Sequence, residues 1–176
     1  NVCAVGLDGQ AWCWGPNDFG QLGTGDTAGA RAPRTAAEGY LFDKISVSSG
    51  GAFACGIATT GAAFCWGSQE GGRLGDGTMA PGGQFVTAPV PVSGGLTFTD
   101  VATGGDHVCG IATGGAAYCW GHNERGQLGT GSFANSTVPV AVSGGLRLTS
   151  ITAHQMVTCG IADGGIAHCW GEGSSG

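Results

Sequence analysis

Cysteine gives the clearest chemical signal in this sequence, because two cysteines stand ten positions apart four times. The stretch CGIATTGAAFC (residues 55–65) contains one such pair. Metal binding, redox exchange and disulfide formation are the chemistries open to these residues. The four pairs are Cys3/Cys13, Cys55/Cys65, Cys109/Cys119 and Cys159/Cys169.

Metal binding and redox exchange both normally use cysteines at a much shorter spacing. Structural zinc sites and thiol redox centres typically carry CxxC motifs, and this sequence contains no CxxC motif. Four identical redox centres in one chain of 176 residues would also be unusual. We therefore predict four structural disulfides, with no metal and no cofactor.

The remaining candidates for catalysis are histidines and carboxylates, and their spacing indicates no catalytic triad. Asp106 beside His107 is the only acid–histidine dipeptide, and neighbouring residues of a strand point to opposite faces. His168 stands where the other copies of its segment carry an aromatic residue, which favours a packing role. The glycine-rich stretches lack the spacing of phosphate-binding loops. We predict that the chain is not an enzyme.

The four cysteine pairs belong to an internal repeat. The triplet Cys-Trp-Gly occurs at 13–15, 65–67, 119–121 and 169–171, so successive copies lie 52, 54 and 50 residues apart. Such periods are typical of β-propeller blades, whereas helical solenoids need Ala-, Leu- and Glu-rich stretches that are absent here. We predict an all-β propeller built from four-stranded blades of about 50 residues.

The third period contains four short segments with strand-like composition, separated by Gly or Asn/Ser turns. They are TDVAT (99–103), HVCGIA (107–112), AAYCW (116–120) and STVPVAV (136–142). In the second period, a tight hairpin centred on Thr60 places Cys55 directly opposite Cys65. Opposed residues of an antiparallel pair have Cα atoms about 4.5–5.5 Å apart, which a disulfide tolerates.

Alternation along this hairpin leaves neither face polar. The two cysteines and Ile57 share one face, and Phe64 and Trp66 share the other. A strand pair that is covered on both faces fits a blade stacked between two neighbours. We therefore expect the tryptophans Trp14, Trp66, Trp120 and Trp170 to fill the space between blades.

Charge and cysteine content limit the possible partners and the compartment. Six basic and twelve acidic residues give a net charge of −6, which argues against nucleic acid as a partner. No apolar run approaches the roughly 20 residues that cross a bilayer, so we expect no membrane insertion. Disulfides persist in oxidising compartments, which predicts an extracellular, periplasmic or cell-surface location.

The segments that follow the first three triplets share one residue order. CWGPNDFGQLGTGD (13–26), CWGSQEGGRLGDGT (65–78) and CWGHNERGQLGTGS (119–132) closely resemble the signature of the regulator of chromosome condensation repeat family. The resemblance continues through residues 88–112 and covers essentially the whole chain. It implies a propeller, typically of seven blades, whose loops bind proteins. The cysteine-containing version resembles the secreted bacterial branch of the family.

The polar loop after each triplet varies between copies while its frame stays constant. This pattern is expected of a binding surface and equally of neutral drift. The insertion at 79–84 and the irregular linker 30–45 are further candidates for specificity loops. Asparagine in two copies favours turn formation. The candidate binding residues are Asn17, Asp18, Phe19, Gln69, Glu70, His122, Asn123, Glu124 and Arg125.

We predict a non-catalytic, secreted or surface-exposed propeller that presents loops for recognition of a protein. One alternative is an inhibitor of a secreted hydrolase, since some secreted relatives of the fold inhibit hydrolases. A second is a propeller lyase or glycan hydrolase, because Asp18, Glu70 and Glu124 occupy equivalent loop positions and could form a rim of carboxylates.

The sequence holds four hairpins but only three linking segments. We therefore expect residues 1–176 to form a single partial propeller, roughly half of a ring. Further blades would come from the same longer chain or from another subunit. The expected repeats are 3–54, 55–108, 109–158 and an incomplete 159–176.

Overall fold

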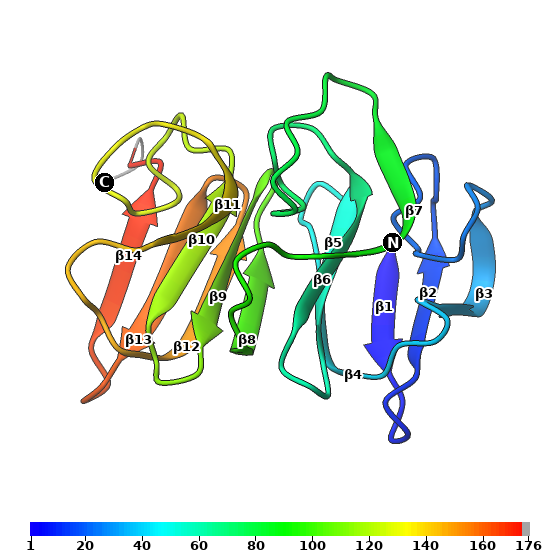
Figure 1. Cartoon of the computed structure of the whole chain (residues 1–176), viewed down its shortest axis with the longest axis horizontal. Coiled ribbons are helices and arrows are strands. Elements are labelled where there is room, and N and C mark those ends of the chain that lie inside the picture. Colours follow the sequence, from blue (N-terminus) through cyan, green and yellow to red (C-terminus); the bar gives the residue numbers. More distant parts are fainter. Residues whose placement is uncertain (174–176) are drawn as a thin grey trace.

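The computed structural model describes residues 1–173, which form four antiparallel sheets. The sheets lie side by side in chain order, with the N-terminal sheet at one side and the C-terminal sheet at the other (Figure 1). The part of the chain that the structure describes contains no helix that could span a membrane. The all-β prediction is confirmed.

Each sheet is built from strands that follow one another along the chain. The first sheet contains β1 (Val2–Val5), β2 (Ala11–Gly15) and β3 (Ala30–Ala36). The second contains β4 (Phe42–Val47), β5 (Phe53–Ala58), β6 (Ala63–Ser68) and β7 (Phe85–Pro91). The third contains β8 (Phe98–Thr103), β9 (His107–Ala112), β10 (Ala117–Gly121) and β11 (Ser136–Ala141). The fourth contains β12 (Leu148–His154), β13 (Val157–Ala162) and β14 (Ala167–Gly171).

The four strands of the third sheet match the segments predicted for the third period. Sequence repeats and sheets are nevertheless offset, because in the two four-stranded sheets a repeat counted from its first cysteine begins in the second strand. The repeat 55–108, for example, begins in β5 and ends at the start of β9. The last three residues of the expected repeat 159–176 lie outside the described residues.

The disulfides confirm the predicted hairpin register. Cys55 pairs with Cys65 across β5 and β6, and Gly56 pairs with Phe64. All four bridges join cysteines ten positions apart, with Cα–Cα distances of 4.2, 4.1, 4.1 and 4.1 Å in chain order. Each bridge therefore ties together the two strands of one hairpin, which are β1–β2, β5–β6, β9–β10 and β13–β14, and the described chain has no free cysteine.

The core lies between the sheets, where the disulfide face of one sheet packs against the tryptophan face of the next. Cys13 packs with Trp66, the Cys55–Cys65 bridge packs with Trp120, and the third bridge packs with Trp170. Trp66 and Trp120 are fully buried, while Trp170 is half-buried. Trp14 departs from the expectation, because it lies on the outer face of the first sheet and is half-buried.

Trp66, Trp120 and Trp170 each pack against the Gly-x-Leu-Gly motif of the preceding sheet, at Gly23, Gly75 and Gly129. Trp66 Nε1 donates a hydrogen bond to the carbonyl oxygen of Gln21 over 3.1 Å, and Leu22 is buried in the same core cluster. A Cβ atom at Gly23 would lie 2.8 Å from Trp66 Nε1. Glycine is required there because a side chain would displace the indole, and because its φ is +69°.

Candidate binding surface

Three long loops leave the same end of the sheets, at the top of Figure 1. They join β2 to β3, β6 to β7 and β10 to β11, and comprise residues 16–29, 69–84 and 122–135. Antiparallel alternation brings the short loops β4–β5, β8–β9 and β12–β13 to the same end. We call the three long loops together the loop surface.

Buried asparagines hold two of these loops in shape. Asn17 Nδ2 donates to the carbonyl oxygens of Asp26 (2.8 Å) and Ala28 (3.2 Å), and its Oδ1 accepts from a backbone N–H five residues on (2.8 Å). Asn123 makes the equivalent three bonds at 2.9 Å. The two residues are 1% and 0% exposed. Their side chains hold the loops in shape and are too buried to contact a partner.

Gln69 takes the place of these asparagines in the second loop. Its Nε2 donates to Asp76 Oδ2 over 3.2 Å, seven residues on. Its backbone N–H donates to the carbonyl oxygen of Gln84 over 2.9 Å, which closes the base of the inserted segment. Gln69 is half-buried. It therefore combines a structural role with partial access to solvent.

The tips of the first and third loops carry exposed residues that sequence analysis selected. Asp18 and Phe19 are exposed in the first loop, and Glu124 and Arg125 are exposed in the third. Arg125 Nε lies 3.7 Å from Glu172 Oε1, at the end of the fourth sheet. A surface ion pair of this kind contributes little stability, so the guanidinium remains available to a partner.

His122 connects two neighbouring loops. It is half-buried, and a Cβ atom at Gly71 would lie 1.9 Å from its imidazole carbon. Glycine at position 71 therefore leaves the space that the imidazole ring occupies. His122 Nε2 is buried and has no hydrogen-bond partner among residues 1–173. The side chain packs loop 122–135 onto loop 69–84.

Arg73 is a residue of this surface that sequence analysis missed. It is 5% exposed, and its Nη1 lies 3.0 Å from Asp106 Oδ1 in the next sheet's β8–β9 loop. Its Nη2 lies 3.5 Å from Glu70 Oε2, and its guanidinium lies 5.6 Å from the centre of the Phe53 ring. The available signal was GRLG in place of GQLG. Glu70 is thus an ion-pair partner of Arg73 in addition to being an exposed tip residue.

Large apolar side chains are exposed in and beside the same loops. Phe133 and Met79 expose 73% and 60% of their surface, and Phe19 and Phe85 are also exposed. Sequence analysis placed Met79 in the insertion but did not select Phe85 or Phe133. Their signal was an apolar residue within a loop otherwise rich in Gly, Ser, Asn and Thr. Exposed aromatic and methionine side chains are common anchors of protein interfaces.

His107 lies beneath this surface, in the contact between the third and fourth sheets. Its Nε2 lies 2.7 Å from Thr158 Oγ1, and Thr158 donates its hydroxyl hydrogen to the carbonyl oxygen of Gln127 over 3.1 Å. Nε2 must therefore carry the proton, while Nδ1 is buried without a partner in the described chain. Burial lowers the pKa of His107 to about 4, against a smaller opposing effect of the Asp106 carboxylate. His107 is a neutral packing residue at pH 7.

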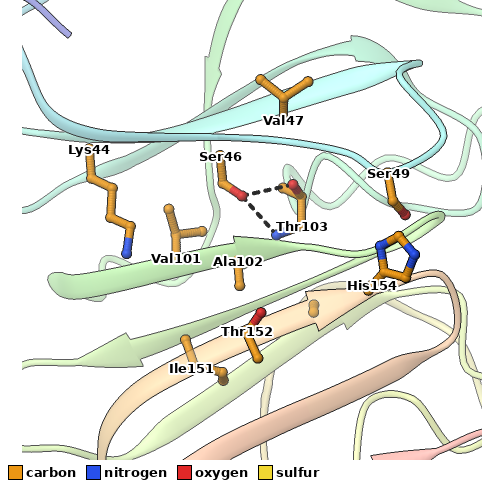
Figure 2. Close-up of a pocket in the computed structure, with 11 residues that line it drawn as sticks. Lys44, Ser46, Val47, Ser49, Val101, Ala102, Thr103, Ile151, Thr152 and His154 are labelled. Carbon is orange, nitrogen blue, oxygen red and sulfur yellow. Dashed lines mark hydrogen bonds between the residues drawn. The ribbon is translucent and has the colours of Figure 1, made fainter. Parts of the chain in front are cut away.

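The first strands of three sheets line a groove of about 440 Å³. Figure 2 shows Ser46 from β4 facing Thr103 from β8, with their oxygens 2.9 Å apart. Lys44 forms an ion pair with Asp100 across the same two sheets. His154 and Ser49 lie together at one end of the groove (Figure 2). The polar groups at the centre of the groove bind one another, Ser46 with Thr103 and Lys44 with Asp100. The groove is therefore a contact between neighbouring blades.

Within residues 1–173, no group of three or more His, Cys, Asp or Glu side chains could hold a metal ion. Asp18, Glu70 and Glu124 lie on three separate loops, and Glu70 is paired with Arg73.

These features define a β-propeller segment with a row of long loops at one end. The chain matches the regulator of chromosome condensation (RCC1) repeat over residues 8–57, 60–111 and 114–161. The chain belongs to this family. It is 32% identical over 126 residues to the mouse E3 ubiquitin-protein ligase HERC2, which is 70% of this chain and 2% of that protein.

Solved structures with low sequence identity share the fold. Human WBSCR16 superposes with a TM-score of 0.82 at 18% identity, covering 96% of this chain and 44% of that one. Yeast RCC1 (Prp20), solved bound to Kap60, superposes with a TM-score of 0.79 at 19% identity and covers 96% and 41%. The chain thus spans less than half of these proteins, and the prediction of a partial propeller of RCC1 type is confirmed.

Proposed function

We propose that this chain is part of a non-catalytic propeller that recognises a protein through the loop surface. Membership of the RCC1 repeat family supports a role in protein–protein interaction. The relative solved in complex with Kap60 supports a protein as the class of partner.

The observation that carries this proposal is the contrast between the frame and the tips of the loops. The backbone of the loops is held by the hydrogen bonds of Asn17 and Asn123. It is held further by the hydrogen bonds that Trp66 and Trp120 donate to carbonyl oxygens of the loops. The tips differ between copies and are exposed. Loops that are already ordered lose little conformational entropy on binding, so such a frame favours affinity as well as specificity.

The chemistry of the tips favours a partner with apolar pockets bordered by hydrogen-bond donors. Phe19 and Phe133 provide aromatic anchors, and Met79 provides a flexible one. Asp18 adjoins Phe19 and is exposed. Glu124 is exposed in the same loop as Phe133. Carboxylates beside an anchor select a partner with N–H or cationic groups around its pocket.

The four disulfides support a secreted or surface-exposed protein. Thiols are kept reduced in the cytosol, whereas structural disulfides persist in oxidising compartments. Inhibition of a secreted hydrolase would be a special case of the same recognition. It would use loop 69–84, because the insertion at 79–84 carries the exposed Met79, which is suited to enter a cleft.

The experiment compares two triple variants. Phe19→Ser/Met79→Ser/Phe133→Ser removes the anchors, and Leu7→Ser/Leu41→Ser/Ile166→Ser changes equally exposed residues at the opposite end of the sheets. A partner is first identified by cross-linking in the extracellular fluid of the organism that makes the protein. Its affinity is then measured with purified components. We expect the first variant to weaken binding at least tenfold and the second to leave it unchanged. The reverse result would place the binding surface at the opposite end.

A further inference from the structure

The three linkers between successive sheets share a backbone hydrogen bond that aligns them with one another. They comprise residues 37–41, 92–97 and 142–147. In each, a backbone N–H near the start of the linker donates to the carbonyl oxygen of the last glycine of the preceding Gly-x-Leu-Gly motif. The donors are Ala37, Ser93 and Ser143, over 2.8, 2.8 and 2.9 Å. Residues at equal distances from these donors are therefore structural equivalents.

The first linker differs from the other two in its side chains. Glu38 stands where the other linkers have glycine, and Tyr40 stands where they have leucine. The equivalent residues are Gly94 and Gly144 for the first position, and Leu96 and Leu146 for the second. Both leucines pack against the core cluster of their contact, so the fold needs an apolar residue there.

Tyr40 meets this need, whereas Glu38 has no evident part in packing. The ring of Tyr40 is half-buried, and its centre lies 4.7 Å from the centre of the Phe64 ring in the second sheet. Glu38 is exposed, and it forms no ion pair among residues 1–173. The carboxylate therefore introduces an uncompensated negative charge that the other two linkers lack.

Glu38 and Tyr40 line a pocket of about 210 Å³ between the first and second sheets. Thr24 of loop 16–29 lines it from the first sheet, and Ala88 and Pro89 of β7 line it from the second. These two sheets already contact each other through a shared core cluster. The pocket thus lies inside the described chain and not on either of its outermost faces.

A cationic group is the ligand that this lining favours. A carboxylate without a counter-charge attracts a cation, and an aromatic ring beside it adds a cation–π attraction. A guanidinium suits such a site better than an ammonium, because it is more weakly hydrated, pairs with a carboxylate through two N–H groups and stacks on aromatic rings. The pocket is smaller than the roughly 300–1,000 Å³ of pockets for drug-sized molecules, so it fits a group the size of one side chain.

We propose that this pocket binds a guanidinium group, with Glu38 as its ion-pair partner and Tyr40 as its aromatic wall. The group would be carried by an arginine side chain of a partner protein or by a small free guanidinium compound. The net charge of −6 would attract either ligand to the protein. The pocket uses none of the exposed loop tips, so this proposal can fail while the proposed function holds.

Titration of the ¹⁵N-labelled protein with acetyl-arginine amide, followed by NMR, tests the proposal. We expect saturable shifts of the amide signals of residues 38–40 and of Ala88. Acetyl-citrulline amide has nearly the same shape without the charge, so it should bind about tenfold more weakly. Agmatine separates the two sources of the group. Tighter binding of acetyl-arginine amide than of agmatine would indicate a protein segment, and the reverse would indicate a small molecule.

Variants of the two lining residues assign their roles. Glu38→Gln removes the charge with little change in shape and should weaken binding about tenfold. Tyr40→Leu introduces the residue of the other two linkers, so it should fold and should bind severalfold more weakly, whereas Tyr40→Phe retains the ring and should bind as the unmodified protein does. Asp163→Asn is the matched control, because it removes an exposed carboxylate in the fourth sheet. The amide spectrum of each variant shows whether it is folded.

The absence of saturable shifts in the pocket would overturn the proposal and make Glu38 an ordinary solvated carboxylate. Equal affinity for acetyl-citrulline amide would overturn it too, because the charge would then not be recognised. A third contrary result is equal weakening by Glu38→Gln and Asp163→Asn, which would show that the ligand responds only to the net charge of the protein.

Discussion

Trp120 Nε1 donates a hydrogen bond to the carbonyl oxygen of Arg73 over 3.2 Å, although the residues lie 47 positions apart and in neighbouring blades. Because Trp120 is fully buried, this bond forms where water cannot replace it. Trp120→Phe removes the donor and part of the buried surface, so we expect a loss of about 2–3 kcal/mol in the free energy of unfolding. Urea denaturation measures it. Trp12→Phe, at an exposed position, should cost less than about 0.5 kcal/mol.

Gly75 combines a positive φ with close contact to an indole. Its φ is +68°, and a Cβ atom there would lie 2.6 Å from Trp120 Nε1. Gly77 also has a positive φ, +89°, but the atom nearest to its added Cβ is 3.6 Å away. Gly77→Ala should therefore cost only the backbone strain of about 1–2 kcal/mol, and Gly75→Ala should cost clearly more. Equal losses in thermal or urea unfolding would show that Trp120 does not require this glycine.

His107 should make the protein less stable in acid. The imidazole proton is bound with a pKa near 6.5 in the unfolded chain and about 4 in the folded protein, because burial disfavours the charged form. Between these values the unfolded state binds more protons, so the stability present above pH 6.5 falls by about 3 kcal/mol as the pH drops to 4.

The variant His107→Phe tests this assignment, because Phe53 occupies the equivalent position in the second sheet. The variant should lose the pH dependence between 6.5 and 4 while remaining folded at pH 7. Unfolding in urea at a series of pH values measures the difference from the unmodified protein. An unchanged pH profile would assign the effect to other groups.

The disulfides should differ in their rate of reduction. The sulfurs of Cys55–Cys65 and Cys109–Cys119 belong to residues that are 0% exposed, whereas Cys169 is exposed on the fourth sheet. Limited reduction followed by alkylation and mass spectrometry should modify Cys159 and Cys169 at least tenfold faster than the two buried pairs. Equal rates would indicate that reduction follows global unfolding.

Local patterns allowed much of the fold to be predicted. The Gly-containing turn and strict alternation determine which residues of a hairpin oppose each other, so the Cys55–Cys65 register followed from eleven consecutive positions. The period of the CWG triplet then indicated the propeller. These features depend on neighbours in sequence, and they were accessible without any tertiary contact.

Two of the missed features depend on contacts between blades. Arg73 reaches Asp106, and His107 reaches Thr158, which lies 51 positions away. No local pattern specifies such partners. Asn17 was selected for its place in a variable loop, but its bonds to residues nine and eleven positions on make it a buried part of the frame. Sequence variation alone does not separate a loop's frame from its tips.

Every covalent cross-link in the described chain stays within one hairpin, so none joins one blade to the next. A unit of this kind can be duplicated or deleted in a gene without leaving an unmatched cysteine. The number of blades can therefore change during evolution without altering which cysteines pair, because each cysteine finds its partner within its own unit.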